Sequence, residues 1–206
     1  MDRRIFLSGL AATGLMAPLP AQARKLGVSE ISSYLKKFRT ARAKFIQANP
    51  DKTLSQGVLY MKKPGRIRYE YTAPAHNLIV SDGKTLGIFD RKSNAGPQRY
   101  PLRRTPLDIL LRDDVDLEKG GFVKNVQSDG VQTRVLAVDP KNAKNGSITM
   151  VFTANPIELR QWIVRERNGK ETTVILSDLK LGGSLNDSLF SIGKLRNELG
   201  QGVGDK

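Results

Sequence analysis

The chain has 206 residues, with 34 Lys and Arg against 20 Asp and Glu, and it contains no cysteine. The formal charge of +14 indicates an acidic partner or an acidic surface. The absence of cysteine excludes a disulfide scaffold, a thiolate nucleophile and a Cys-ligated zinc site. It also leaves no residue that could carry the acyl anchor of a bacterial lipoprotein.

The first residues have the pattern of a secretory signal peptide. Arg3-Arg4 precede an apolar stretch over residues 5–19, and Ala21-Gln22-Ala23 follows as a cleavage site. We predict a signal peptide over residues 1–23, cleavage after Ala23 and a single periplasmic domain over residues 24–206. The paired arginines fit both the general secretory route and the twin-arginine route. In that compartment anionic lipid headgroups or an acidic protein fit the charge better than nucleic acid, so no nucleic-acid partner is predicted.

One amphipathic helix is predicted after the signal. Ser29 can cap it, and Glu30 is favourable in its first turn. The apolar positions of this helical pattern are Ile31, Tyr34, Leu35, Phe38, Ala41 and Phe45.

From about Lys44 the pattern changes to the two-residue period of strands. Over residues 65–71 the residues Ile67, Tyr69 and Tyr71 face one side of a strand, and charged residues face the other. Tight turns are predicted at three dipeptides, which are Asp82-Gly83, Asp129-Gly130 and Asn168-Gly169. The pattern predicts a mainly β fold, with about ten strands in a meandering antiparallel sheet, and a tail that frays from Asn197.

One segment interrupts the strands. Thr105-Pro106 is typical of a helix start, with Thr105 as the capping residue. The residues that follow, Leu107, Ile109, Leu110 and Leu111, make a short helix that is apolar nearly all round. Such a helix is either a plug in the core or a lid over a hydrophobic opening, and the pattern allows both.

Candidate catalytic residues are scarce. His76 is the single histidine, and no serine lies in a Gly-x-Ser-x-Gly frame. Asp113-Asp114 lies beside basic residues in a predicted loop, and no ligand set for zinc or calcium is present. We therefore predict no catalytic residues, no metal, no cofactor and no enzymatic activity. A half-closed sheet with an apolar face suits a lipid-like ligand instead.

The segment 62–90 resembles the outer-membrane lipoprotein carrier (LolA) family. The similarity lies in a basic pair before proline, an aromatic strand, a further proline and an apolar strand that runs into Ser-Asp-Gly-Lys-Thr-Leu. In this chain these are Lys62-Lys63-Pro64, the strand over residues 65–71, Pro74 and residues 78–86. Thr105-Pro106-Leu107 is similar to the lid region of that family.

The resemblance implies an unclosed β-barrel covered by helices, whose cavity holds the acyl chains of lipoproteins. It also implies transfer from an inner-membrane ABC transporter to an outer-membrane receptor or membrane surface. The family's receptor is itself a lipoprotein, so the chain without cysteine is similar to the soluble carrier, which we expect to be a monomer. The family often has Arg before the proline, bonded to the lid; Lys63 stands there in this chain.

We therefore predict a mainly β fold, an unclosed antiparallel β-barrel with an N-terminal helix and a short lid helix, and candidate site residues on it. Lys63 is predicted to close the lid. The alternative is that Lys63 lies at the rim of the barrel and its ammonium reaches solvent. Each predicted acyl-chain residue named below could equally be a core residue that contacts no ligand. The alternatives to a carrier are a lipid-sensing or lipoprotein-sensing regulatory module of the same fold and an envelope hydrolase. The predicted acyl-chain residues are Ile31, Leu35, Phe38, Leu59, Met61, Ile67, Tyr69, Tyr71, Leu78, Val80, Leu107, Leu110 and Leu111.

Overall fold

A computed structural model describes residues 24–201, so the predicted signal peptide lies outside the described residues. Eleven strands form one antiparallel sheet in the order β6-β5-β4-β3-β2-β1-β11-β10-β9-β8-β7. The strands are β1 (Thr40–Ala48), β2 (Leu54–Lys62), β3 (Arg66–Tyr71), β4 (Asn77–Asp82), β5 (Thr85–Asp90), β6 (Gln98–Pro101), β7 (Val123–Ser128), β8 (Gln132–Ala137), β9 (Gly146–Ala154), β10 (Ile157–Glu166) and β11 (Glu171–Leu181).

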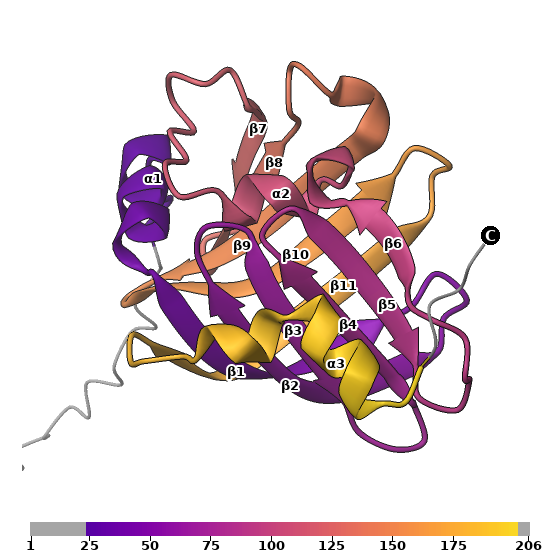
Figure 1. The fold of residues 1–206 in the computed structure, drawn as a ribbon. Coiled ribbons are helices and arrows are strands. Elements are labelled where there is room, and N and C mark those ends of the chain that lie inside the picture. The colour runs from indigo at the N-terminus through magenta and orange to yellow at the C-terminus, as the bar shows by residue number, and fades with distance from the viewer. Residues whose placement is uncertain (1–23, 202–206) are drawn as a thin grey trace, which may run out of the picture.

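The sheet curves into a half-barrel with β6 and β7 at its two ends (Figure 1). Strands that are neighbours in sequence pair, except β6 and β7, and the pairing of β1 with β11 joins the two halves of the chain. The predicted unclosed antiparallel β-barrel is confirmed. The three predicted turns are also confirmed, since each dipeptide lies at the connection between two paired strands.

Short helices lie on both faces of the sheet (Figure 1). The α-helices are α1 (Val28–Lys37), α2 (Leu107–Leu111) and α3 (Ile192–Glu198). The 3-10 turns are η1 (Leu102–Arg104), η2 (Ala143–Asn145) and η3 (Asp187–Phe190). Among residues 24–201, no helix has the length and apolar character that a bilayer crossing requires.

Helix α1 is shorter than the sequence pattern predicted. It begins at Val28 after Gly27, whose N–H donates to the Glu30 carboxylate at 2.9 Å, so the predicted cap at Ser29 is wrong. It ends before Phe38, and Ala41 and Phe45 lie in β1 instead. The residues of β1 alternate between buried and exposed. Ala41 and Phe45 are four residues apart, a spacing that places two residues on one face of a strand and also on one face of a helix.

The sheet buries apolar side chains on both faces, because successive residues of a strand point to opposite sides. The inner cluster lies on the concave face below α1 and α2. The outer cluster lies on the convex face below α3 and consists of Leu78, Val80, Phe89, Phe190, Ile192 and Leu195. The inner cluster is larger and includes Leu35, Phe45, Leu59, Met61, Ile67, Leu110, Met150, Leu159, Trp162 and Leu176.

The C-terminal segment does not fray from Asn197, as the sequence suggested. Asn197 lies in α3, and the side chain of Gln201 is buried beyond it. The Gln201 amide donates hydrogen bonds to the carbonyl oxygens of Asp90 and Ser93, at 2.8 and 2.9 Å. The segment is held because α3 covers apolar residues of β4 and β5 that would otherwise face water.

Candidate lipid-binding site

The centre of the concave face comes from β2 and β3. Leu59 pairs with Tyr69 and Met61 with Ile67, so the register places all four side chains on one face. Tyr71 lies on the same face, and all five predicted residues are buried in the inner cluster. The structure therefore brings this part of the predicted site together.

The two tyrosines of β3 keep this surface neutral. Burial raises the pKa of Tyr71 to about 12, and burial beside Tyr71 raises the pKa of Tyr69 well above its usual value. The Tyr71 hydroxyl donates to the Gln47 side-chain oxygen at 2.9 Å. Phe45 packs edge-on against both rings, with centroids 5.4 and 5.2 Å apart. An uncharged aromatic wall of this kind suits a hydrocarbon chain.

Helix α1 lies over one end of the concave face. Ile31, Leu35 and Phe38 all belong to the inner cluster, as predicted for the helix stripe. Tyr34 adds a polar attachment, since its hydroxyl accepts a hydrogen bond from the Leu159 N–H at 3.1 Å. The hydroxyl of Ser32 accepts another from the Leu117 N–H, also at 3.1 Å, and so joins α1 to the segment after α2.

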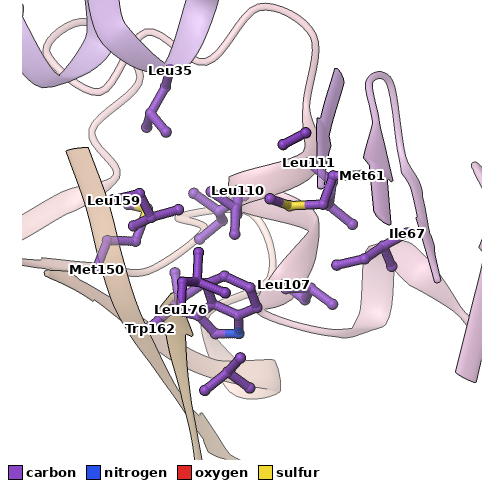
Figure 2. Close-up of a cluster of buried hydrophobic side chains, with 14 of the residues drawn as sticks. Leu35, Met61, Ile67, Leu107, Leu110, Leu111, Met150, Leu159, Trp162 and Leu176 are labelled. Atoms are coloured by element: carbon purple, nitrogen blue, oxygen red, sulfur yellow. The ribbon is translucent and has the colours of Figure 1, made fainter. Parts of the chain in front are cut away.

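Helix α2 covers the middle of the concave face. Its apolar residues Leu107, Ile109, Leu110 and Leu111 are all buried. Figure 2 shows Leu110 between Met61 of β2 and Leu159 of β10, within the inner cluster. The predicted cap is wrong, because the Thr105 hydroxyl donates to the Leu102 carbonyl oxygen at 2.8 Å and Pro106 precedes the first helical residue.

Leu78 and Val80 do not lie on the concave face, and their prediction as acyl-chain residues is wrong. Both belong to the outer cluster below α3. Ile79, between them in β4, packs against the inner cluster instead. A strand buried on both faces has no polar residues to mark its sides, so the apolar run over residues 78–80 could not show which face is inner.

The second half of the concave wall was not predicted as part of the site. It comes from β9, β10 and β11, and Figure 2 shows Met150, Leu159, Trp162 and Leu176 from these strands facing the α2 leucines. The alternation of β9 would have revealed Met150. Trp162, the single tryptophan, is 1% exposed and pairs with Val174 of β11 and Met150 of β9.

Lys63 is buried, with 5% of its surface exposed, so it is not a rim lysine that reaches solvent. Its ammonium donates to the Leu35 carbonyl oxygen at 2.7 Å and lies 4.2 Å from the centroid of the Phe38 ring. The predicted contact with the lid helix is wrong, because the accepting carbonyl belongs to α1. Burial, together with the positive charge of Arg39, lowers the pKa of Lys63 to about 8.

Helix α2 is held at its C-terminal end by two other groups. The N–H of Gly65, in the β2–β3 turn, donates to the Leu111 carbonyl oxygen at 2.8 Å. Gly65 has a φ of +73°, and a Cβ there would lie 2.6 Å from the Gly83 carbonyl oxygen, so the turn requires glycine.

Arg112, directly after α2, is the second group. It pairs with Asp108 of α2 and with Asp139 beyond β8, and its guanidinium lies 5.0 Å from the centroid of the Phe122 ring. Arg112 was not predicted from the sequence as part of the site. The spacing of Asp108 and Arg112, four residues apart, is the signal that could have found it.

A groove of about 950 Å³ opens beside α2, between the β5–β6 edge and the ends of β9 and β10. Its apolar lining comes from Leu86, Ile88, Tyr100 and Val164. Leu86 pairs with Tyr100 across the two strands, and both Leu86 and Val164 pack against the inner cluster. The apolar concave face therefore continues outward to solvent at this groove.

The described part of the chain offers little for metal chemistry, since residues 24–201 contain no group of three His, Cys, Asp or Glu side chains that could hold an ion. What the site combines is a neutral apolar face, a short apolar helix over it and polar attachments for that helix.

Comparison with known proteins identifies the family. The family model for the outer membrane lipoprotein carrier protein LolA matches residues 36–193, from the last turn of α1 to the start of α3. The chain belongs to the LolA family. Membership confirms the predicted family and the predicted function as an outer-membrane lipoprotein carrier, and LolA proteins are non-enzymatic carriers of the periplasm that bind lipoproteins.

Two relatives cover almost the whole chain. The outer-membrane lipoprotein carrier protein of Cupriavidus necator is 29% identical over 202 residues, which span 92% of this chain and 94% of that protein. The carrier protein of Nitrosomonas europaea is 26% identical over 200 residues, with the same coverage of 92% and 94%. A crystal structure of a LolA superfamily protein from N. europaea matches with a TM-score of 0.44 and 12% identity, covering 81% of this chain and 98% of that one.

Proposed function

We propose that the mature protein, cleaved after Ala23, holds the acyl chains of lipoproteins on the concave face beneath α2. It accepts them from an inner-membrane ABC transporter and delivers them to an outer-membrane receptor or membrane surface. The observation that carries the proposal is α2 itself, a five-residue helix whose apolar residues cover the inner cluster in a chain of the lipoprotein carrier family.

Loading requires α2 to move. In the closed state side chains pack together below α2 (Figure 2), and a close-packed interior has no room for an added chain. An acyl chain that replaces the α2 leucines contributes about 0.8 kcal/mol for each buried CH₂ group. The closed state competes with the cargo for the same apolar surface, and this competition makes release possible.

Site-specific photo-crosslinking tests the location of the acyl chains. A photoreactive phenylalanine analogue is placed at Leu107 of α2, and a matched control at Ile192 of α3; these positions are 8% and 5% exposed. We expect crosslinks to a lipoprotein from position 107 and none from position 192, because only the first lies over the concave face. Equal labelling from both positions would contradict the proposal.

Transfer to acceptor membranes tests the carrier function against a purely sensing role. A protein loaded with labelled lipoprotein should deliver it to outer-membrane vesicles that contain receptor. A sensing module would bind the lipoprotein and keep it.

The intact mass of the periplasmic protein tests processing, and the expected first residue is Arg24.

Replacing Arg3 and Arg4 by Lys separates the two export routes, since only the twin-arginine route should fail.

A further inference from the structure

The groove beside α2 carries an excess of positive charge. Arg104, Lys144 and Arg167 line it together with the carboxylate of Glu166, so three positive groups against one negative leave a net charge of +2. All four side chains are exposed. Within residues 24–201, none of the three cations forms an ion pair with a carboxylate.

Some cations elsewhere in residues 24–201 do form ion pairs. Lys62 lies 2.7 Å from Asp187, and Arg68 lies 2.6 Å from Glu70. Because no carboxylate pairs with them, the three cations of the groove are available to a ligand.

The same groove has an apolar floor. Leu86, Ile88 and Val164 are half-buried in it, and Tyr100 has 45% of its surface exposed. Apolar floor and cationic rim together fit a molecule with a hydrocarbon chain and an anionic head. The groove volume of about 950 Å³ is within the range of pockets that bury a small organic ligand.

We propose that this groove is a binding site for one phospholipid with an anionic headgroup. The guanidinium forks of Arg104 and Arg167 and the ammonium of Lys144 suit the phosphate oxygens, because arginine binds phosphate with two parallel hydrogen bonds. The acyl chain lies along Leu86, Ile88 and Val164. The site goes beyond the proposed carrier function, since it is open while α2 is closed and needs no lipoprotein.

The apolar floor favours a lipid over an acidic peptide. A peptide in the groove would place part of its polar backbone against Leu86, Ile88 and Val164, and these side chains offer it no hydrogen bonds. A hydrocarbon chain loses nothing there. Binding of an acidic peptide with the same affinity as a lipid would overturn the proposal.

Calorimetric titration of the mature protein tests the ligand class. The probe is dihexanoyl phosphatidylglycerol below its micelle concentration, and we expect saturable binding of one molecule that weakens as salt is added. Dihexanoyl phosphatidylcholine should bind several-fold more weakly, because its choline cancels the negative charge. Inorganic phosphate should bind at least about tenfold more weakly than the phosphatidylglycerol, because it makes no contact with the apolar floor.

Charge variants test the location. The triple variant Arg104→Gln, Lys144→Gln, Arg167→Gln should lower the affinity for phosphatidylglycerol about tenfold or more. The single variant Glu166→Gln should raise it about two-fold or more, because a repelling carboxylate is removed. Both variants should keep the native fold, because the four side chains are exposed.

A matched triple variant removes the same charge elsewhere. Lys25→Gln, Lys37→Gln, Lys180→Gln replaces three exposed lysines outside the groove lining and should leave the affinity unchanged. Equal loss in both triples would mean that binding follows net charge alone and would overturn the site.

Two further outcomes would also overturn it. Inorganic phosphate that binds as tightly as the lipid would make the groove an anion site without a lipid. Binding to phosphatidylglycerol vesicles without any binding of the soluble lipid would make it a membrane-docking face. Lipoprotein loading is measured separately on the groove triple, so failure of the phospholipid site leaves the carrier function to its own test.

Discussion

Helices α2 and α3 cover opposite faces of one sheet and are attached to it differently (Figure 1). Around α3, Arg68 of β3 donates to the Leu189 carbonyl oxygen at 2.9 Å, and Lys62 of β2 donates to the Leu185 carbonyl oxygen at 2.8 Å. Gln201 holds the chain beyond α3 through the carbonyl oxygens of Asp90 and Ser93. The chain that carries the outer helix is thus bonded to the sheet both before and after α3.

The chain around α2 is also bonded, by the Leu102 N–H to the Lys84 carbonyl oxygen at 2.8 Å and by the Leu117 N–H to the Ser32 hydroxyl at 3.1 Å. Within α2 itself, Gly65 and Arg112 attach the C-terminal end, and the leucines make apolar contacts. Apolar contacts have no fixed direction and can be replaced by those of an acyl chain. An acyl chain has no groups that could replace directed hydrogen bonds to carbonyl oxygens. In the proposed carrier function, α3 belongs to the permanent fold and α2 exchanges its contacts for cargo.

The largest effect is expected in the outer cluster. Phe190 is 1% exposed, so Phe190→Ala should lower the free energy of unfolding by about 3–5 kcal/mol. Lipoprotein transfer by the molecules that remain folded should be unchanged. Urea unfolding and a transfer assay measure the two effects. The control Leu54→Ala, at a position 72% exposed, should leave stability nearly unchanged. If Phe190→Ala lost lipoprotein transfer at unchanged stability, the cargo would bind on the convex face and the proposed site would be wrong.

A charged substitution in each helix sharpens the comparison. Leu110→Asp would bury an unpaired carboxylate, which costs several kcal/mol while α2 stays closed. We expect α2 to leave the surface, the β circular dichroism signal to remain and lipoprotein transfer to be lost. The matched variant Leu195→Asp in α3 should destabilise the sheet itself. If Leu110→Asp unfolds the protein as well, α2 is a core plug and not a lid.

Lys63 predicts a pH dependence. Its pKa of about 8 is below the unfolded value of about 10.5, so between these pH values the unfolded chain binds more protons than the folded one. Stability contributed at this position should therefore rise with pH, by at most about 3 kcal/mol. The measurement is the difference in free energy of unfolding between the natural chain and Lys63→Met at pH 7, 8, 9 and 10. A difference that stays constant would refute the shift.

The smallest effect is expected at the attachment of α2. Arg112→Gln removes the ion pairs with Asp108 and Asp139 and should cost about 1–2 kcal/mol, because Asp139 is 9% exposed and loses its charged partner. Lipoprotein should load faster because α2 opens more easily. Arg39→Gln is the control, since the Arg39–Asp113 pair is exposed and is worth less than about 1 kcal/mol. Identical loading rates in both variants would exclude Arg112 from lid closure.

The sequence predicted correctly which residues share a face where the other face of the element is exposed to solvent. Ile67, Tyr69 and Tyr71 alternate with charged residues in β3, and the structure places all three on the concave face. It failed at Leu78 and Val80, where α3 covers the second face and removes the polar signal. It also failed at Ala41 and Phe45, whose spacing fits a helix and a strand equally well over so short a stretch.

The amino-acid sequence by itself determined the antiparallel meander, the three turns, the apolar character of α2 and the likeness to the lipoprotein carriers, because each of these depends on residues close together in the chain. Only the tertiary structure decided which apolar residues share a face and which partners the polar groups find. Lys63 meets Leu35 across 28 positions, and Arg112 meets Asp139 across 27. Such contacts depend on the curvature of the whole sheet, and no local pattern of residues records it.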